Sequence, residues 1–344
     1  MYNSYLHINS KTLCENITQV IKELPEGCSL IPVLKDNAYG LGMCEVASYV
    51  SQFSEISTIA VAHISEGIEL RLAGLKQDIL VIGNPLPSLV KDALDYNLTL
   101  SVGYKELADF LPKGTAVQIM IDSGLRRNGF LPFELPPFSS LNVTGSYSHF
   151  ADPADKNRCE EQFKTFTAVD LPGIKHISSS ASFENYPEYS LDAVRIGRRL
   201  YQDAPGVYGG SIKESASWRC FITNTYSACK GDRLGYGEGT VLESSCRLAS
   251  ISVGYGDGLS EKLVESGGSV LVNGKRCPFK VCFMDQAIID VSGVDCSIGD
   301  EVTLFGYDKS GNLLSSQELA LIAEENEGVG LYSKLSPRVE RIYT

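Results

Sequence analysis

The chain has 344 residues, of which 43% are hydrophobic and 21% charged, and this length favours two globular domains. Its formal net charge of −12 argues against a nucleic acid or an anionic membrane surface as a partner. No apolar run reaches the ~18 residues of a membrane helix, and the opening residues lack the pattern of a signal peptide. We therefore expect a soluble cytoplasmic protein.

The ten cysteines contain no C-x-x-C pair, and the chain has four histidines. Cys277 and Cys282 have poor spacing for zinc and no second pair of ligands. Reduced thiols are therefore expected, and no metal site.

From residue 29 to about 197, short β-branched or apolar runs alternate with segments of helical pattern. The eight predicted strands lie in 29–35, 58–63, 78–83, 98–102, 117–122, 143–150, 174–180 and 192–197. The predicted helices lie in 42–53, 65–74, 87–96, 105–111 and 155–166. Eight βα units in this length predict a closed (β/α)8 barrel rather than an open sheet.

The pattern changes after residue 212, where strand-like runs are joined by Gly-rich turns and only 315–325 has a helical pattern. This indicates a smaller, mostly β domain. We place the barrel at 10–212 and the β domain at 213–344, which an N-terminal strand within 1–9 could join.

Five polar residues stand at or just after the ends of predicted barrel strands: Lys35, Arg127, His149, Ser180 and Arg195. Each has an ordinary explanation, such as a solvated lysine, a structural ion pair, a core histidine or a helix cap. The carboxyl ends of barrel strands share one rim, however, and that rim carries the working groups of such barrels.

Two arginines, a histidine and a helix-opening serine suit a ligand with phosphate and carboxylate groups. A lysine in the same barrel mouth suits a Schiff base. Together these groups point to pyridoxal phosphate and an amino-acid substrate.

The chain resembles the alanine racemase family over nearly its whole length. The segments that carry the resemblance are "VLKDNAYGLG", "IDSGLRRNGF", "SHFADPAD", "SSSAS", "VRIGRRLY", "SVGYGDG" and "FMDQ". The resemblance implies that Lys35 forms the internal aldimine with the cofactor pyridoxal 5′-phosphate. It implies that the phosphate is held by Tyr39, Ser180 and the amides of Gly197 and Arg198, while His149 lies beside the pyridine ring and Arg195 bonds the pyridine nitrogen.

The resemblance also implies a substrate site and a homodimer. Arg127 and the backbone amide of Met284 would meet the substrate carboxylate, and Tyr255 would be the second catalytic base. Tyr255 and Met284 would come from the partner subunit. The implied product, D-alanine, would supply the bacterial cell wall.

Two bases are expected because racemisation removes the α-proton from one face and returns a proton on the other. Lys35 and Tyr255 are the expected pair. Arg195 is effectively always protonated, so it can donate to the pyridine nitrogen but will hardly protonate it. An acidic partner there would make the ring a stronger electron sink, as in the decarboxylases of the same fold.

Three departures from the family pattern leave alternatives open. Met120 stands where many members carry a modified lysine that orients the arginine, Val329 stands where a second tyrosine usually reaches the phosphate, and Leu41 stands where a histidine is common. A pyridoxal-phosphate-binding protein without turnover therefore stays an alternative. The "RRNG" segment resembles that of broad-spectrum racemases, so serine or a wider set of substrates is a second alternative to alanine.

Overall fold

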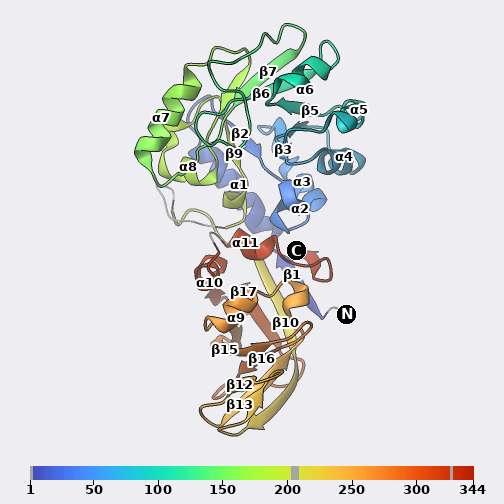
Figure 1. Ribbon diagram of the computed structural model, residues 1–344. Coiled ribbons are helices and arrows are strands. Elements are labelled where there is room, and N and C mark those ends of the chain that lie inside the picture. Colours follow the sequence, from blue (N-terminus) through green and yellow to red (C-terminus); the bar gives the residue numbers. More distant parts are fainter. Residues whose placement is uncertain (1–2, 203–208, 326–327) are drawn as a thin grey trace. The chain divides into compact units, whose positions relative to one another are not determined.

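The structure is a computed structural model that describes residues 3–202, 209–325 and 328–344. The chain divides into two compact units (Figure 1). Unit 1 consists of Met1–Leu13, Tyr39–Leu41 and Lys213–Thr344, and unit 2 consists of Cys14–Ala38 and Gly42–Ile212.

Unit 2 is built on parallel strands. Within the described residues they are β2 (Ser29–Pro32), β3 (Thr58–Val61), β4 (Asp78–Val81), β5 (Thr99–Val102), β6 (Ala116–Met120), β7 (Asn142–Tyr147), β8 (Ile174–His176) and β9 (Ala193–Ile196). Strands β3 to β8 pair in chain order, and β2 pairs with β9. Parallel bridges from Val33 to Ala60 and from Ser179 to Arg195 join these two sheets at both edges, so the strands close into a barrel.

Part of the buried core of unit 2 consists of aliphatic side chains from the barrel strands. Ile31, Val33, Ala60, Leu80 and Ala193 form one buried cluster. Strands such as β3 are buried along most of their length, as expected when a parallel sheet is covered on both faces.

Helices cover the outside of the barrel, with α4, α5 and α6 on one side and α7 and α8 on the other (Figure 1). The helices and helical turns of this part of the chain are α1 (Ser10–Glu23), α2 (Lys35–Tyr39), α3 (Met43–Val50), α4 (Ile64–Leu72), η1 (Pro87–Leu89), α5 (Val90–Asp95), α6 (Lys105–Phe110), α7 (Lys156–Thr167), α8 (Ser180–Asn185), η2 (Pro187–Tyr189) and η3 (Arg198–Leu200).

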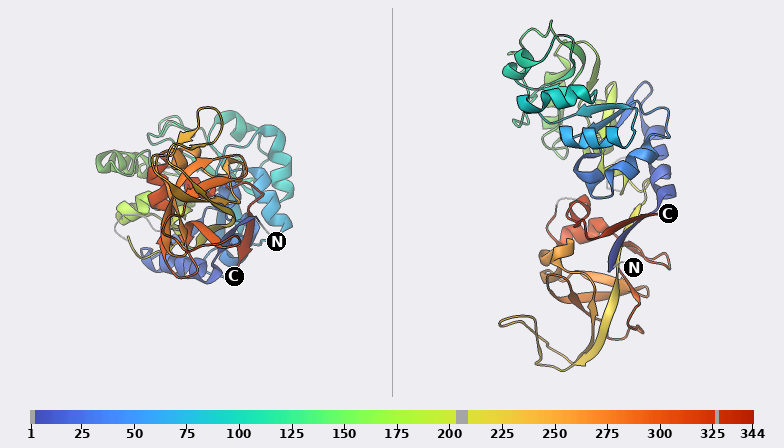
Figure 2. Two further views of the ribbon diagram at one scale, coloured as in Figure 1. Left: turned by 90° about the horizontal axis from the view of Figure 1, so that it is seen from below. Right: turned by 90° about the vertical axis from the view of Figure 1, so that its right-hand side faces the viewer.

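Unit 1 is mostly β. Its main sheet has the order β18-β17-β14-β15-β16-β13-β10-β1-β19, and β17 also pairs with β10. The long β10 strand, yellow in Figure 2, pairs with β1, β13 and β17. Because β1 pairs antiparallel with β10 and parallel with β19, the two ends of the chain lie side by side in this sheet.

The strands of unit 1 are β1 (Ser4–Ile8), β10 (Ala216–Ala228), β11 (Arg233–Leu234), β12 (Thr240–Val241), β13 (Cys246–Ile251), β14 (Ser269–Val272), β15 (Lys275–Cys282), β16 (Ala287–Asp290), β17 (Glu301–Tyr307), β18 (Leu313–Leu314) and β19 (Glu340–Tyr343). Its helices and turns are η4 (Tyr255–Asp257), α9 (Glu261–Glu265), α10 (Ser316–Ile322) and α11 (Val329–Tyr332).

The predicted fold class, a (β/α)8 barrel with a smaller, mostly β domain, is confirmed. Each predicted barrel strand overlaps an observed one. The pattern did not lead us to predict α1, α2, α8, α9 or α11, of which the last four are only four to six residues long. Within the described residues, no helix is both long and apolar enough to cross a membrane.

Candidate functional site

The barrel places five of the predicted site residues after, or within, the last residues of its strands. Lys35 follows β2, Arg127 lies in the loop after β6, and His149 follows β7. Ser180 opens α8 after β8, and Arg195 is the penultimate residue of β9. All five belong to unit 2.

Lys35 begins a turn of unusual hand. The next four residues, Asp36 to Tyr39, have φ between 52° and 57°, a left-handed conformation that costs ~1–2 kcal/mol per residue with a side chain. The turn is held by hydrogen bonds from the amide of Asp36 to Oε1 of Glu66 (2.6 Å) and from the amide of Met43 to Oδ1 of Asn37 (2.8 Å). Such concentrated strain is typical of functional sites.

Arg195 forms the centre of the hydrogen-bonding network. Its side chain is buried, and Nη1 donates to Nδ1 of His176 (2.6 Å) while Nη2 donates to the carbonyl of Ser148 (2.7 Å). Nη2 also lies 3.1 Å from Nδ1 of His149, and the guanidinium stacks over the ring of Tyr147 at 5.1 Å. Nε makes no hydrogen bond within the described part of the chain, which leaves one donor for a ligand.

These contacts define the protonation of both histidines. An arginine can only donate, so Nδ1 of His149 and Nδ1 of His176 must be acceptors. Nε2 of His176 then carries the proton and donates to Oε1 of Gln118 at 2.6 Å. Burial and the charge of Arg195 lower the pKa of His149 to about 3 and that of His176 well below its usual value. Both rings are therefore neutral at physiological pH.

The barrel mouth is rich in positive charge. Burial, followed by the charge of Arg127, lowers the pKa of the Lys35 amine, with a smaller contribution from Arg195. Burial also lowers the pKa of Arg195 to about 10, so its guanidinium stays charged at neutral pH. Three cationic side chains at one rim suit an anionic ligand.

Ser180 lies against the turn that follows β9. Its Oγ is 3.3 Å from the amide of Gly197 and 3.5 Å from that of Arg199. Both distances are long for hydrogen bonds, so Ser180 holds these two amides only weakly. A serine hydroxyl beside weakly bonded amides is a fitting cradle for phosphate oxygens, and the free Nε of Arg195 fits an aromatic nitrogen. The residues present therefore fit pyridoxal phosphate.

Arg127 is exposed, and its guanidinium makes no hydrogen bond or ion pair within the residues that the structure describes. Met120 is buried at the end of β6 and has no polar group to offer it. The backbone of this loop is instead organised by Asp122, whose Oδ1 accepts from the amides of Gly124 and Arg126.

Gly197 and Arg198 also belong to unit 2, whereas the other three predicted residues, Tyr39, Tyr255 and Met284, belong to unit 1. Tyr255 and Met284 lie on adjacent segments, because the amides of Tyr255 and Gly256 donate to the carbonyls of Phe283 (3.0 Å) and Met284 (2.8 Å). A Cβ on Gly254 would come within 2.2 Å of the Phe283 carbonyl oxygen, so this close approach requires glycine. The side chains of Tyr255 and Met284 are 41% and 59% exposed.

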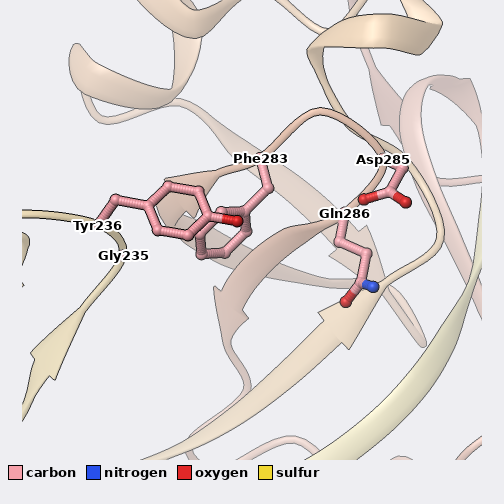
Figure 3. Close-up of a pocket in the computed structure, with 5 residues that line it drawn as sticks. All are labelled: Gly235, Tyr236, Phe283, Asp285 and Gln286. Atoms are coloured by element: carbon pink, nitrogen blue, oxygen red, sulfur yellow. The ribbon is translucent and has the colours of Figure 1, made fainter.

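A shallow pocket adjoins these segments. It is lined by Gly235, Tyr236, Phe283, Asp285 and Gln286, and the rings of Tyr236 and Phe283 meet edge to face at 5.4 Å (Figure 3). Tyr236 is 88% exposed. Unit 1 therefore presents exposed aromatic and apolar side chains around Tyr255 and Met284.

Tyr332, the tyrosine nearest to Val329 in the sequence, is fully buried. Its hydroxyl donates to Glu214, which also accepts from Ser316 Oγ at 2.5 Å. Burial raises the pKa of Glu214 to about 7. The hydroxyl of Tyr332 is therefore hydrogen-bonded in the interior of unit 1.

The sequence pattern did not identify His176, Gln118, Glu66 or the ion pairs of Glu184. His176 lies inside the predicted strand "IKHISSS" and becomes the last residue of the observed β8, so the sequence pattern gave no signal for its role. Glu66 shows the pattern of a capping residue, since its Oε2 accepts from the amides of Ala62 and His63. Its further bond to Asp36 depends on tertiary structure.

The hydrogen bonds of Arg195 predict the ring tautomers. In long-range ¹H–¹⁵N spectra, His149 and His176 should both show a protonated Nε2 and an unprotonated Nδ1. Because their pKa values lie below the ordinary range, neither set of signals should titrate between pH 5 and pH 8. In an H176N variant the signals of His176 disappear, which identifies them in the wild-type spectrum. A protonated Nδ1, or a midpoint within this pH range, would contradict the network.

The sequence of the chain is similar to those of known proteins along nearly its whole length. The family profile described as "Alanine racemase, N-terminal domain" matches residues 8–205, and "Alanine racemase, C-terminal domain" matches 215–343. The alanine racemase of Clostridium tetani is 32% identical, over 94% of this chain and 91% of that protein. That of Desulforamulus reducens is 34% identical, over 88% of this chain and 90% of that protein.

Solved structures of alanine racemases are also similar to this chain. The alanine racemase of E. faecalis has a TM-score of 0.90 at 28% identity, covering 100% of this chain and 98% of that one. That of Bacillus anthracis, with bound L-Ala-P, has a TM-score of 0.90 at 26% identity, covering 100% and 95%. The chain therefore belongs to the alanine racemase family.

Proposed function

We propose that the protein is a pyridoxal-phosphate-dependent racemase that interconverts L- and D-alanine. The observation that carries the proposal is the buried Arg195 with its unused Nε, next to two histidines that are held neutral. When bound, pyridoxal phosphate supplies the electron sink that acidifies the α-proton. The D-alanine formed would serve peptidoglycan synthesis.

Lys35 would carry the cofactor and act as one catalytic base. Its lowered pKa, caused by burial and by Arg127, makes the neutral amine easier to form. Tyr39, Ser180 and the amides of Gly197 and Arg198 would bind the phosphate, and Arg127 with the amide of Met284 would bind the substrate carboxylate.

Arg195 and His149 limit the chemistry that can follow. A guanidinium whose pKa is about 10 donates a hydrogen bond at neutral pH but gives up its proton poorly. His149 is neutral, so it is no source of a proton either. The pyridine nitrogen would therefore stay unprotonated, which favours simple return of the α-proton over decarboxylation or transamination.

Tyr255 of the partner subunit would be the second base, in a homodimer. This is supported by the exposure of Tyr255 and Met284 on one pair of segments, since groups that serve a neighbouring subunit must be presented at the surface. The residues of unit 2 would then meet Tyr255 and Met284 of the second copy.

Two bases on opposite faces make a specific prediction for Tyr255→Phe. With L- or D-alanine in deuterium oxide, the wild-type protein should exchange the α-proton of both enantiomers and lose optical rotation. In the variant, racemisation should fall ~10²–10⁴-fold, the usual contribution of a general acid or base. Exchange should persist for the one enantiomer whose proton faces Lys35, and proton NMR with polarimetry measures both rates.

Tyr236→Phe is the matched control, because it removes another exposed hydroxyl from unit 1, and its rates should equal those of the wild type. Equal losses of exchange from both enantiomers in Tyr255→Phe would contradict the two-base assignment. A wild-type protein that binds pyridoxal phosphate but exchanges neither alanine nor serine would be a cofactor-binding protein. If serine exchanged its α-proton faster than alanine, serine rather than alanine would be the preferred substrate.

If each active site takes residues from both subunits, two inactive variants should complement each other. Lys35→Ala and Tyr255→Phe should each be inactive alone. After subunit exchange, half of the dimers are mixed, and each has one site with both bases intact, so racemisation should recover to about a quarter of the wild-type rate. If each site lay within one chain, the mixture would be no more active than its components.

A further inference from the structure

The turn after β9 is anchored by a buried ion network. Glu184 is 1% exposed, Arg198 is 3% exposed and Arg199 is fully buried. The carboxylate of Glu184 contacts Nη2 of Arg198 through Oε2, and its Oε1 accepts from Nη1 of Arg199 at 3.1 Å. One carboxylate thus binds the guanidinium groups of two consecutive residues.

The network continues beyond Glu184. Nη2 of Arg199 donates to Oε2 of Glu23 at 2.7 Å and to Oγ of Ser211 at 2.8 Å. In addition, Nδ2 of Asn16 donates to the carbonyl of Leu200 at 3.1 Å. The η3 turn is therefore tied to α1, to α8 and to the segment near residue 211.

Glu184 and Ser180 lie four residues apart on α8 and so share one face of that helix. Ser180 touches the amides of Gly197 and Arg199, and Glu184 holds the side chains of Arg198 and Arg199. The same helical face therefore contacts both the backbone and the side chains of this turn.

Through Nη2, the guanidinium of Arg198 is paired with Glu184, and this pair fixes the direction of the side chain. The proposed function assigns the phosphate to the backbone amides of this turn. The direction in which the N–H bonds of these amides point depends on how firmly the turn is held. Removing one partner of a buried ion pair leaves an uncompensated charge, and the structure relaxes to relieve it.

We propose that Glu184 is a positioning residue for the cofactor phosphate: it holds Arg198 and Arg199 so that the amides of Gly197 and Arg198 face the phosphate. This inference rests on the proposed function, because it assumes that pyridoxal phosphate is the ligand. To that function it adds a role for the buried ion network, which holds in place the turn whose amides would bind the phosphate.

The test compares pyridoxal phosphate with pyridoxal, which keeps the aldehyde and lacks the phosphate. Both are titrated into the full-length apoprotein and followed by visible absorbance. In Glu184→Gln, the dissociation constant for pyridoxal phosphate should rise at least tenfold, and that for pyridoxal should change less than twofold. Parallel changes in both constants, or no change in either, would overturn the proposal.

Glu301→Gln is the matched control. Glu301 is a largely buried carboxylate of unit 1, paired with Arg219 at 3.5 Å, with Lys309 at 3.1 Å and with the Tyr5 hydroxyl at 2.5 Å. This variant should leave the ratio of the two dissociation constants unchanged. If the dissociation constant for pyridoxal phosphate, divided by that for pyridoxal, rose as much in Glu301→Gln as in Glu184→Gln, the proposal would also be overturned, because loss of any such pair would then suffice.

If Glu184→Gln does not fold, as judged by circular dichroism, Glu184→Asp replaces it. This variant keeps the charge but withdraws it by one methylene group, and should weaken pyridoxal phosphate about threefold with pyridoxal unchanged. Equal effects on both ligands would reject the positioning role. A wild-type protein that binds neither ligand would reject the proposed function itself, which separates the two failures.

Discussion

The arrangement of the candidate site depends on one buried charge, the guanidinium of Arg195. Its hydrogen-bond acceptors are the carbonyls of Ser148, His176 and Ile177 and the ring nitrogens of His149 and His176, and none of these is a carboxylate. A buried cation is costly unless its donors are satisfied. Two nearby rings must therefore stay neutral and accept, and Nε is left as a donor without a hydrogen bond within the described residues.

The strained segment at Lys35 is the second constraint. Four successive left-handed residues are unfavourable by themselves, so the surrounding structure must hold them. Glu66 does this in unit 2 by bonding the amide of Asp36. Within unit 1, Arg341 bonds the carbonyl of Gly40, and the Tyr343 hydroxyl bonds that of Leu41. The chain is thereby constrained on both sides of Tyr39.

Much of this could be predicted from the sequence, because local patterns determine it. The barrel strands are apolar and short, and polar residues stand at or just after the ends of several of them, so both the fold class and the strand-end positions of Lys35 and Arg195 were predictable. The left-handed turn was not, since Asp, Asn and Ala carry no signal for four such residues in succession. The roles of His176 and Glu184 depend on partners 19 and 14 residues away in the sequence, so neither could be inferred from local pattern.

The central claim is that the strand-end groups of unit 2 form a pyridoxal phosphate site with Lys35 as its covalent anchor. The most direct measurement is to load the protein with pyridoxal phosphate, reduce it with borohydride and map the modified peptide by mass spectrometry. The account predicts a single phosphopyridoxyl group on Lys35. Modification of another lysine, or none after loading, would contradict it.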